Sequence, residues 1–204
     1  MFVINCKNYE EISGDKITKF VKIAEKISKK YKVKIAISPP QHLVGLVANS
    51  SVQILAQHID VSKVGSTTGF IIPELLKKSG VKGSLINHSE HRITSKEIEK
   101  LVLKLKELKM ISILCVKDVA EVKKYAKLDP DYIAIEPPEL IAKAASIVNN
   151  SKNKTKLLCG AGIVSGEDVA KAVELGSKGI LVASGIIKAK DWNKVISEFA
   201  KALV

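Results

Sequence analysis

The chain of 204 residues has few aromatic side chains and almost no arginine. Aromatic residues make up 4% of the sequence, and 32 of its 33 basic side chains are lysines, the exception being Arg92. Proteins that bind single-stranded nucleic acid set aromatic rings among basic residues, and no such interleaving occurs here. The formal net charge of +12 therefore indicates a solvated, lysine-rich surface rather than a nucleic-acid site.

Long apolar runs are also missing, and cysteines are few. No stretch is long enough to span a bilayer, and nothing resembles a signal peptide. The three cysteines (Cys6, Cys115 and Cys159) fall at predicted strands without the spacing of metal ligands, as expected of small buried residues in a reducing cytoplasm. No linker divides the chain. We therefore expect a cytoplasmic protein with no membrane contact and a single domain over residues 1–204.

Short apolar runs alternate with amphipathic stretches along the whole sequence. The predicted strands are Phe2–Asn5, Val33–Ser38, Val52–Gln57, Ser84–Asn87, Ser112–Val116, Tyr132–Ile135, Lys156–Cys159 and Gly179–Val182. The predicted helices are Asp15–Lys30, Gln41–Ala48, Pro73–Ser79, Lys96–Lys109, Asp118–Ala126, Ala142–Val148, Gly166–Leu175 and Trp192–Leu203.

Eight strand–helix repeats in a chain of this length predict an α/β fold, a compact single-domain (β/α)₈ barrel. An open doubly wound sheet is the alternative, but the even count and the absence of a Gly-x-Gly-x-x-Gly turn after the first strand argue against it. In a barrel of this kind, the residues that follow each strand form the reactive face.

Polar residues follow the first and fourth predicted strands. Asn5 and Lys7 are two positions apart, and the lysine could neutralise a developing oxyanion or a phosphate, although a surface lysine is the simpler interpretation. The segment Asn87–Arg92 holds two of the four histidines. A short helical turn at Ser89-Glu90 would lower the pKa of His88 and leave a neutral imidazole as donor. A capping segment with an ordinary histidine is the alternative, and zinc ligation by His88, Glu90 and His91 is disfavoured by their spacing.

The strand Tyr132–Ile135 delivers one carboxylate, Glu136, to its carboxyl end. Pro137 and Pro138 then prevent the ladder from continuing. A lone acid is costly in a core but suited to a cleft, and a solvated glutamate is the plain alternative.

Small residues follow the last two predicted strands. Cys159-Gly160-Ala161-Gly162 and Ala183-Ser184-Gly185 would let backbone N–H groups approach an anion closely, and a phosphate site recurs at these two loops of such barrels.

These motifs resemble the triosephosphate isomerase family, in particular its short archaeal branch, over nearly the whole chain. They are Asn5-x-Lys7, Gln57–Asp60, Gly65–Gly69, His88-Ser89-Glu90, Ile135–Ile141, Cys159–Gly162 and Leu181–Gly185.

The resemblance implies a TIM barrel that interconverts dihydroxyacetone phosphate and D-glyceraldehyde 3-phosphate. Glu136 would be the base, His88 the neutral electrophile and Lys7 the oxyanion stabiliser. This family is itself the standard example of that glutamate–histidine pairing. Asn5 would hold Lys7, and Glu90 would orient it. Binding of the substrate is implied for Asn5, Lys7, Ile141, Gly162, Ala183 and Ser184. No cofactor or metal is implied.

One departure from the family lies after Ile141, where the chain runs straight into Ala142 and reaches no glycine before Gly160. On the order of a dozen residues are missing, the size of an active-site lid. The sequence allows a true deletion or an omitted disordered segment. Since mobile lids are often unseen, we expect a chain break near Ile141–Ala142.

The resemblance further implies a homo-oligomer, built from dimers and tending towards a tetramer, in which the loop Gly65–Gly69 enters a neighbouring subunit through Thr67 and Thr68. A surface loop is the alternative. Two other functions stay open: another phosphate-binding barrel enzyme such as an aldolase, which would need a strand-borne Schiff-base lysine, and a basic nucleic-acid binder, which would show steep salt dependence.

Overall fold

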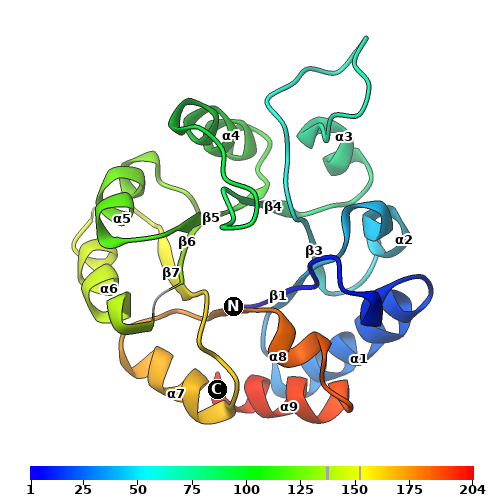
Figure 1. The fold of residues 1–204 in the computed structure, drawn as a ribbon, viewed down its shortest axis with the longest axis vertical. Helices are drawn as coiled ribbons and strands as arrows, with labels where there is room; N and C mark the ends of the chain where they lie inside the picture. Colours follow the sequence, from blue (N-terminus) through cyan, green and yellow to red (C-terminus); the bar gives the residue numbers. More distant parts are fainter. Residues whose placement is uncertain (137, 152) are drawn as a thin grey trace.

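Eight parallel strands close into a barrel in the order of the sequence (Figure 1). The computed structural model describes residues 1–136, 138–151 and 153–204. The strands are β1 (Phe2–Asn5), β2 (Ile35–Ser38), β3 (Gln53–Ala56), β4 (Gly83–Ile86), β5 (Ile111–Val116), β6 (Tyr132–Ile135), β7 (Lys156–Cys159) and β8 (Ile180–Val182). The predicted (β/α)₈ barrel is confirmed, since β1 pairs in parallel with both β2 and β8.

Helices surround the barrel on its outer side (Figure 1). The α-helices are α1 (Lys16–Tyr31), α2 (Val44–Val47), α3 (Pro73–Lys78), α4 (Ser95–Glu107), α5 (Val119–Tyr125), α6 (Ile141–Asn149), α7 (Gly166–Glu174), α8 (Ser184–Ile187) and α9 (Trp192–Ala202). The 3₁₀ turns are η1 (Glu10–Ile12), η2 (Gln41–Leu43), η3 (Ala126–Leu128) and η4 (Pro138–Leu140). No helix in the described part of the chain is long and apolar enough to cross a membrane.

The alternation of side chains along each strand divides the core into two layers. Inside the barrel, small and branched residues such as Val3, Ala36 and Leu55 pack together. Their strand neighbours, such as Phe2 and Ile4, point outward and pack against the helices. Both faces of the strands are therefore covered, which explains why the strands are continuously apolar.

Local signals set the helix starts correctly. Thr94 caps α4 and Ser165 caps α7, and in each capping box the side chain of the third helical residue returns a hydrogen bond. Two predicted elements differ from the structure. The predicted helix Gln41–Ala48 is divided into η2 and α2, and the loop after β8 contains the four-residue helix α8. Such short elements lack the periodic pattern on which the predictions rest.

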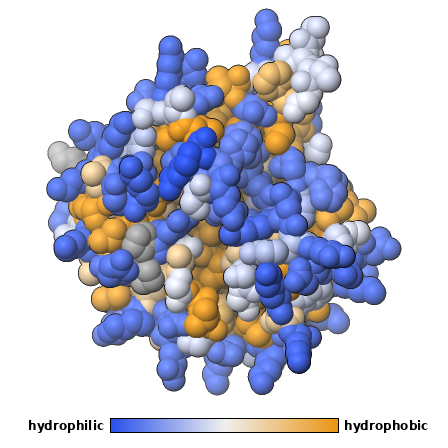
Figure 2. Space-filling view, viewed as in Figure 1, coloured by the Kyte–Doolittle hydropathy of each residue, from blue (hydrophilic) through white to orange (hydrophobic). Residues whose placement is uncertain are grey.

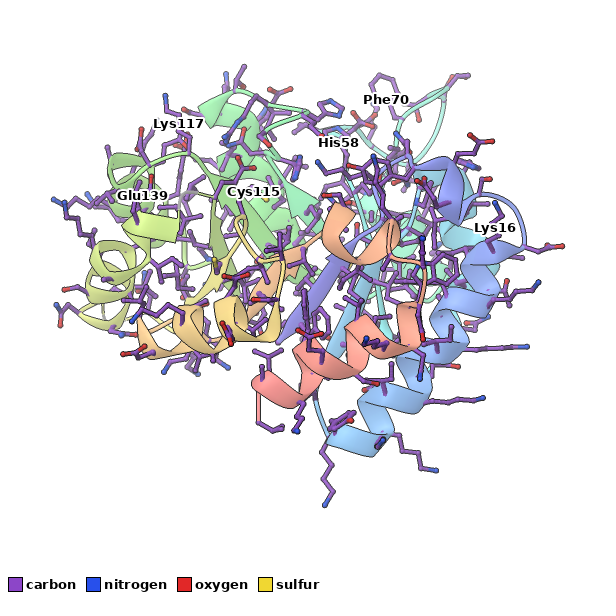
Figure 3. The ribbon with its side chains drawn as sticks, turned by 60° about the horizontal axis from the view of Figure 1, so that its bottom comes forward. Lys16, His58, Phe70, Cys115, Lys117 and Glu139 are labelled. Carbon is purple, nitrogen blue, oxygen red and sulfur yellow. The ribbon has the colours of Figure 1, made fainter. Side chains whose placement is uncertain are left out.

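A long connection between β3 and α3 projects from the barrel (Figure 1). Its base is closed by Asp60 and Ile71: the Asp60 N–H donates to the Ile71 carbonyl at 2.9 Å, and the Ile71 N–H donates to the Asp60 carboxylate at 2.6 Å. Phe70 on this loop is half exposed, and Figure 3 shows it standing clear of the helices, while His58 lies nearer the barrel mouth. The face shown in Figure 2 is mostly hydrophilic, with hydrophobic patches among the charged side chains.

Candidate active site

Lys7 follows β1 in a left-handed backbone conformation, with φ of 46°. Three neighbours hold it there. The side-chain oxygen of Asn5 accepts from the Lys7 N–H at 3.0 Å, and the side-chain amide of Gln57 donates to the Lys7 carbonyl at 2.9 Å. The ammonium group donates to Glu90 at 2.7 Å. Because a left-handed lysine is strained, these bonds fix the direction in which its side chain leaves the strand.

A second left-handed residue, Asn87, stands between β4 and His88, with φ of 60°. Its side chain donates to the Cys115 carbonyl at 3.0 Å and accepts from the Ile93 N–H at 3.1 Å. Nη1 of Arg92 donates to the Asn87 carbonyl at 3.1 Å. The strand β4 therefore ends at Ile86, one residue earlier than predicted. The left-handed turn at Asn87 directs His88 into the barrel mouth.

The hydrogen bonds of His88 determine its tautomer. Nδ1 accepts from the Glu90 N–H at 3.2 Å, so the proton of the neutral ring lies on Nε2. Burial lowers the pKa of His88, and its effect outweighs the opposing charges of Glu90 and Glu136. The expected direction holds, but its cause differs: Ser89-Glu90 is a single turn closed by the His91 N–H and the His88 carbonyl at 2.8 Å, with no helix to supply a dipole.

Two donors meet at this point without an acceptor between them. The side-chain oxygen of Asn5 is engaged by Lys7, so its NH₂ group faces Nε2 of His88, at 3.4 Å. Since both groups carry hydrogen, this contact is a poor hydrogen bond. Two N–H groups beside an ammonium group suit an oxygen that gains negative charge.

Glu136 lies at the carboxyl end of β6 and lines the same hollow as Lys7 and His88, with a volume of about 280 Å³. The lining also includes Gly160–Val164, which follow β7, and Leu181–Gly185, which end β8 and follow it. Gly162 has φ of 71°, a conformation that favours glycine. The structure thus brings Glu136, His88, Lys7, Gly162, Ala183 and Ser184 to one opening, and Asn5 and Glu90 adjoin it in a neighbouring hollow that also contains Lys7.

Comparison with known proteins agrees with this arrangement. The family described as triosephosphate isomerase matches residues 1–199. The chain belongs to the triosephosphate isomerase family. Its expected reaction, the isomerisation of triose phosphate, is confirmed at the level of the family.

Relatives named triosephosphate isomerase resemble the chain over almost their full lengths. The protein of Cenarchaeum symbiosum is 50% identical over all of this chain and 97% of its own length. That of Methanothermus fervidus is 43% identical, covering 97% of this chain and 96% of its own. The crystal structure of triosephosphate isomerase from Bartonella henselae superposes with a TM-score of 0.71 over 97% of this chain and 98% of that one, at 17% identity, and supports the fold.

The chain has a short connection after β6. The expected chain break near Ile141–Ala142 is wrong, because both residues lie in the first turn of α6. Ile141 is 1% exposed and packs in the core, and it is not among the described residues that line the hollow. Pro137 lies outside the described residues. The alignment with the Cenarchaeum protein runs over 216 positions, and since this chain has 204 residues, it lacks at least 12 of them.

The sequence pointed to the candidate side chains at the hollow but not to those that support them. Gln57 and Arg92 each donate to the carbonyl of a left-handed residue, Lys7 or Asn87. The only signal for Gln57 in the sequence is that it is a polar residue at the end of an apolar strand. The only signal for Arg92 is that it is the single arginine of the chain. Neither signal reveals which carbonyl the side chain would reach, because the partners are separated by up to 50 positions.

Replacement of Gln57 by methionine is expected to lower kcat/KM roughly tenfold. It removes the donor to the Lys7 carbonyl at similar volume, and a left-handed lysine that loses about 1 to 2 kcal/mol of support spends less time in the catalytic geometry. Steady-state kinetics beside thermal unfolding measures this. Gln53→Met, at the opposite end of β3, is the control and should keep full activity. Equal losses in both variants, or a parallel fall in stability, would contradict a positioning role.

Proposed function

We propose that this chain interconverts dihydroxyacetone phosphate and D-glyceraldehyde 3-phosphate through an enediolate intermediate. The observation that carries the proposal is the convergence of one carboxylate, one imidazole tautomer and one ammonium group at a single hollow beside two small-residue loops. We take residues 1–204 as one catalytic domain.

In the proposed mechanism, Glu136 removes a proton from the carbon next to the carbonyl group. The electron pair of that C–H bond moves into a new carbon–carbon double bond, and negative charge collects on the carbonyl oxygen. The Nε2–H of His88, the Asn5 amide and the Lys7 ammonium stabilise this oxygen. Glu136 then returns the proton to the former carbonyl carbon, while the proton of the neighbouring hydroxyl group passes to the former carbonyl oxygen by way of Nε2 of His88. The carbonyl group thereby moves to the adjacent carbon, and the reaction needs no oxidant and no cofactor.

The phosphate group is proposed to bind between the loops after β7 and β8. Backbone N–H groups at the start of α8 lack partners within the helix, and Gly162 and Gly185 let an anion approach the chain closely. Ala183 and Ser184 face the same hollow. Binding energy from this remote group would position the triose for proton transfer.

A coupled assay starting from D-glyceraldehyde 3-phosphate tests the proposed function. Dihydroxyacetone phosphate formed by the purified protein is reduced at the expense of NADH by an added dehydrogenase. Turnover proportional to the protein concentration is expected. Failure of a correctly folded protein to turn over either triose phosphate would refute the proposal.

We further propose that the missing positions belong to the lid that would cover this hollow. Only four residues separate Glu136 from α6. A site left open exposes the enediolate to water and weakens each electrostatic contact.

Inserting the corresponding segment of the Cenarchaeum protein between Ile141 and Ala142 is expected to raise kcat/KM at least tenfold, because a cover excludes water from the reacting carbon. Steady-state kinetics with dihydroxyacetone phosphate measures the gain. The control is an insertion of the same length made of glycine and serine. Equal rates in the original chain and the Cenarchaeum insertion would show that the short connection is not a missing lid.

A homo-oligomer is proposed as the working form, with a dimer as its unit and a tetramer as the complete assembly. The projecting loop carries half-exposed apolar residues, Val64 and Phe70, and Thr67 and Thr68 lie between them. A hollow of about 560 Å³ opens beside Lys7 and Tyr9. The loop of one copy would fill this hollow in another and shield Lys7 from water. Triose phosphate is the small-molecule partner, and the proposed location is the cytoplasm, consistent with three buried free cysteines.

The double variant Thr67→Arg/Thr68→Arg is expected to sediment as a monomer. Its two added charges would meet Lys7 of the neighbouring copy, where like charges repel. Sedimentation velocity at micromolar concentration checks this prediction against the wild type, which should sediment as four chains. Leu46→Arg, on the exposed side of α2, is the control and should keep the wild-type mass. A monomeric wild type would rule out the proposed assembly.

A further inference from the structure

Lysines stand at the start of three strands on one side of the barrel, at the end opposite the active site. Lys34 precedes β2, Lys178 stands two residues before β8, and Lys156 opens β7. In the barrel β7 and β8 are adjacent, and β1 lies between β8 and β2, so the lysines belong to a run of four consecutive strands. Neighbouring strands are about 4.8 Å apart, so this rim of positive charge is roughly 14 Å long.

The backbone holds this rim together. The Phe2 N–H donates to the Lys34 carbonyl at 2.9 Å, and the Met1 amino group donates to the Lys178 carbonyl at 3.1 Å. The Lys178 N–H in turn donates to the Leu157 carbonyl at 2.8 Å. The positions of the lysines on the rim are therefore set by the barrel itself and not by a loose loop.

A hollow of about 390 Å³ opens at this rim. Its lining residues are Met1, Lys32, Val33, Lys34, Tyr132, Asn149, Thr155, Lys156, Lys178, Leu203 and Val204. No aspartate or glutamate side chain is among them. The charged side chains of this lining are the four lysines, so its side chains carry a net positive charge. Asp131, beside Tyr132 in the sequence, already accepts two hydrogen bonds from Ser112, both at 2.9 Å.

Thr155 provides an independent observation. It is 6% exposed and lines the hollow, and its hydroxyl has no hydrogen-bond partner among the described residues. A buried hydroxyl without a partner is costly. Rotation about the Cα–Cβ bond would present it to an oxygen atom that enters the hollow.

The electrostatic potential in the hollow is positive. The pKa of the Met1 amino group is lowered, first by burial and then by repulsion from Lys156 and Lys34. Charges that repel one another in this way, with no aspartate or glutamate side chain in the lining, are relieved by a bound anion.

We propose that this hollow binds the phosphate chain of a small polyphosphate, with Lys34, Lys156 and Lys178 contacting its oxygens and Thr155 donating from within. A single phosphate could reach only one or two of the lysines along a rim of this length, whereas a chain of three phosphates spans more of them. Free polyphosphate and a nucleoside triphosphate share this chemistry. The site is separate from the catalytic hollow, because its lysines begin the strands whereas Lys7 and His88 follow them.

Isothermal titration calorimetry of the full chain with sodium triphosphate tests the proposal. Measurements at low salt contain excess dihydroxyacetone phosphate, so that the catalytic hollow is occupied. Saturable binding is expected, and Lys34→Gln/Lys156→Gln should weaken it roughly a hundredfold, about tenfold for each charge-assisted hydrogen bond that the variant can no longer make. The control Lys19→Gln/Lys22→Gln removes the same charge from the exposed side of α1 and should change the affinity less than about twofold.

Thr155→Val separates binding from folding. It removes a buried hydroxyl that has no described partner, so the free protein should unfold at the same or a higher temperature, while triphosphate binding weakens several-fold. In a parallel arm, adenosine triphosphate should bind as tightly as triphosphate if the phosphate chain alone is recognised, and more tightly if the site takes a nucleotide. The proposal is overturned by a lack of binding, by equal weakening in the α1 control, or by binding that excess dihydroxyacetone phosphate abolishes.

Discussion

Glu136→Gln is expected to lower kcat for triose phosphate isomerisation by about a thousandfold. The amide keeps the size and polarity of the carboxylate at the end of β6 but cannot accept a proton at neutral pH, and a positioned general base typically contributes 10²- to 10⁴-fold. The coupled assay measures this in both directions. KM should change much less than kcat, because the triose phosphate still binds through its phosphate group.

Exchange of the substrate proton is the sharper test of the same residue. In deuterated water, the wild type should place deuterium on the carbon where Glu136 returns the proton, and Glu136→Gln should lose this exchange together with turnover. Glu139→Gln serves as control, since it changes an exposed glutamate three positions along the chain. A Glu136→Gln variant within tenfold of the wild type would assign the base to another group.

His88→Gln is expected to lower kcat/KM by roughly 10²- to 10³-fold, the effect of removing one preorganised donor from a developing oxyanion. Glutamine lacks the rigid ring that is held through Nδ1 by the Glu90 N–H at 3.2 Å. His42→Gln, which changes a histidine outside the two hollows that hold the candidate residues, is the control and should keep activity. A loss below about threefold in His88→Gln would exclude His88 as the electrophile.

The protonation of His88 provides the pH dependence. Burial lowers the pKa of His88, so the ring should stay neutral at pH 7 and charge only below the ordinary histidine value of about 6.5. The neutral form is the active one, since a proton on Nδ1 would face the Glu90 N–H. The neutral ring of His88 therefore contributes fully to stability and activity above pH 6.5. This contribution is lost as the pH falls through the pKa of His88 in the folded protein, which lies below 6.5. Nitrogen NMR of labelled histidine checks this, and a titration midpoint above 6.5 would contradict it.

Much of the arrangement could be predicted because it depends on local chemistry. The sequence Tyr132–Ile135 is continuously apolar and is followed by Glu136 and two prolines. This local pattern places Glu136 at the end of a strand, whatever the position of that strand in the sheet. The caps at Thr94 and Ser165 are likewise made by residues three positions apart. The starts of these two helices follow from such short-range rules.

The connection after Ile141 shows the limit of this approach. Its length could be read from the chain, but the expectation of a break there was wrong, because resemblance to longer relatives cannot say whether a shorter connection still joins β6 to α6. In the structure, Ile141 is buried and begins the helix. The chain therefore enters α6 directly after η4, with Ile141 packed in the core.

By itself, the sequence determined the barrel, the family and which strand ends carry the acid, the imidazole and the ammonium group, because hydrophobic period and turn chemistry act over a few residues. Only the tertiary structure decided that the His88 proton lies on Nε2, that Gln57 and Arg92 support Lys7 and Asn87, and that four lysines share one hollow at the far rim. These features depend on distances between residues far apart in the sequence, which become defined only when the barrel closes.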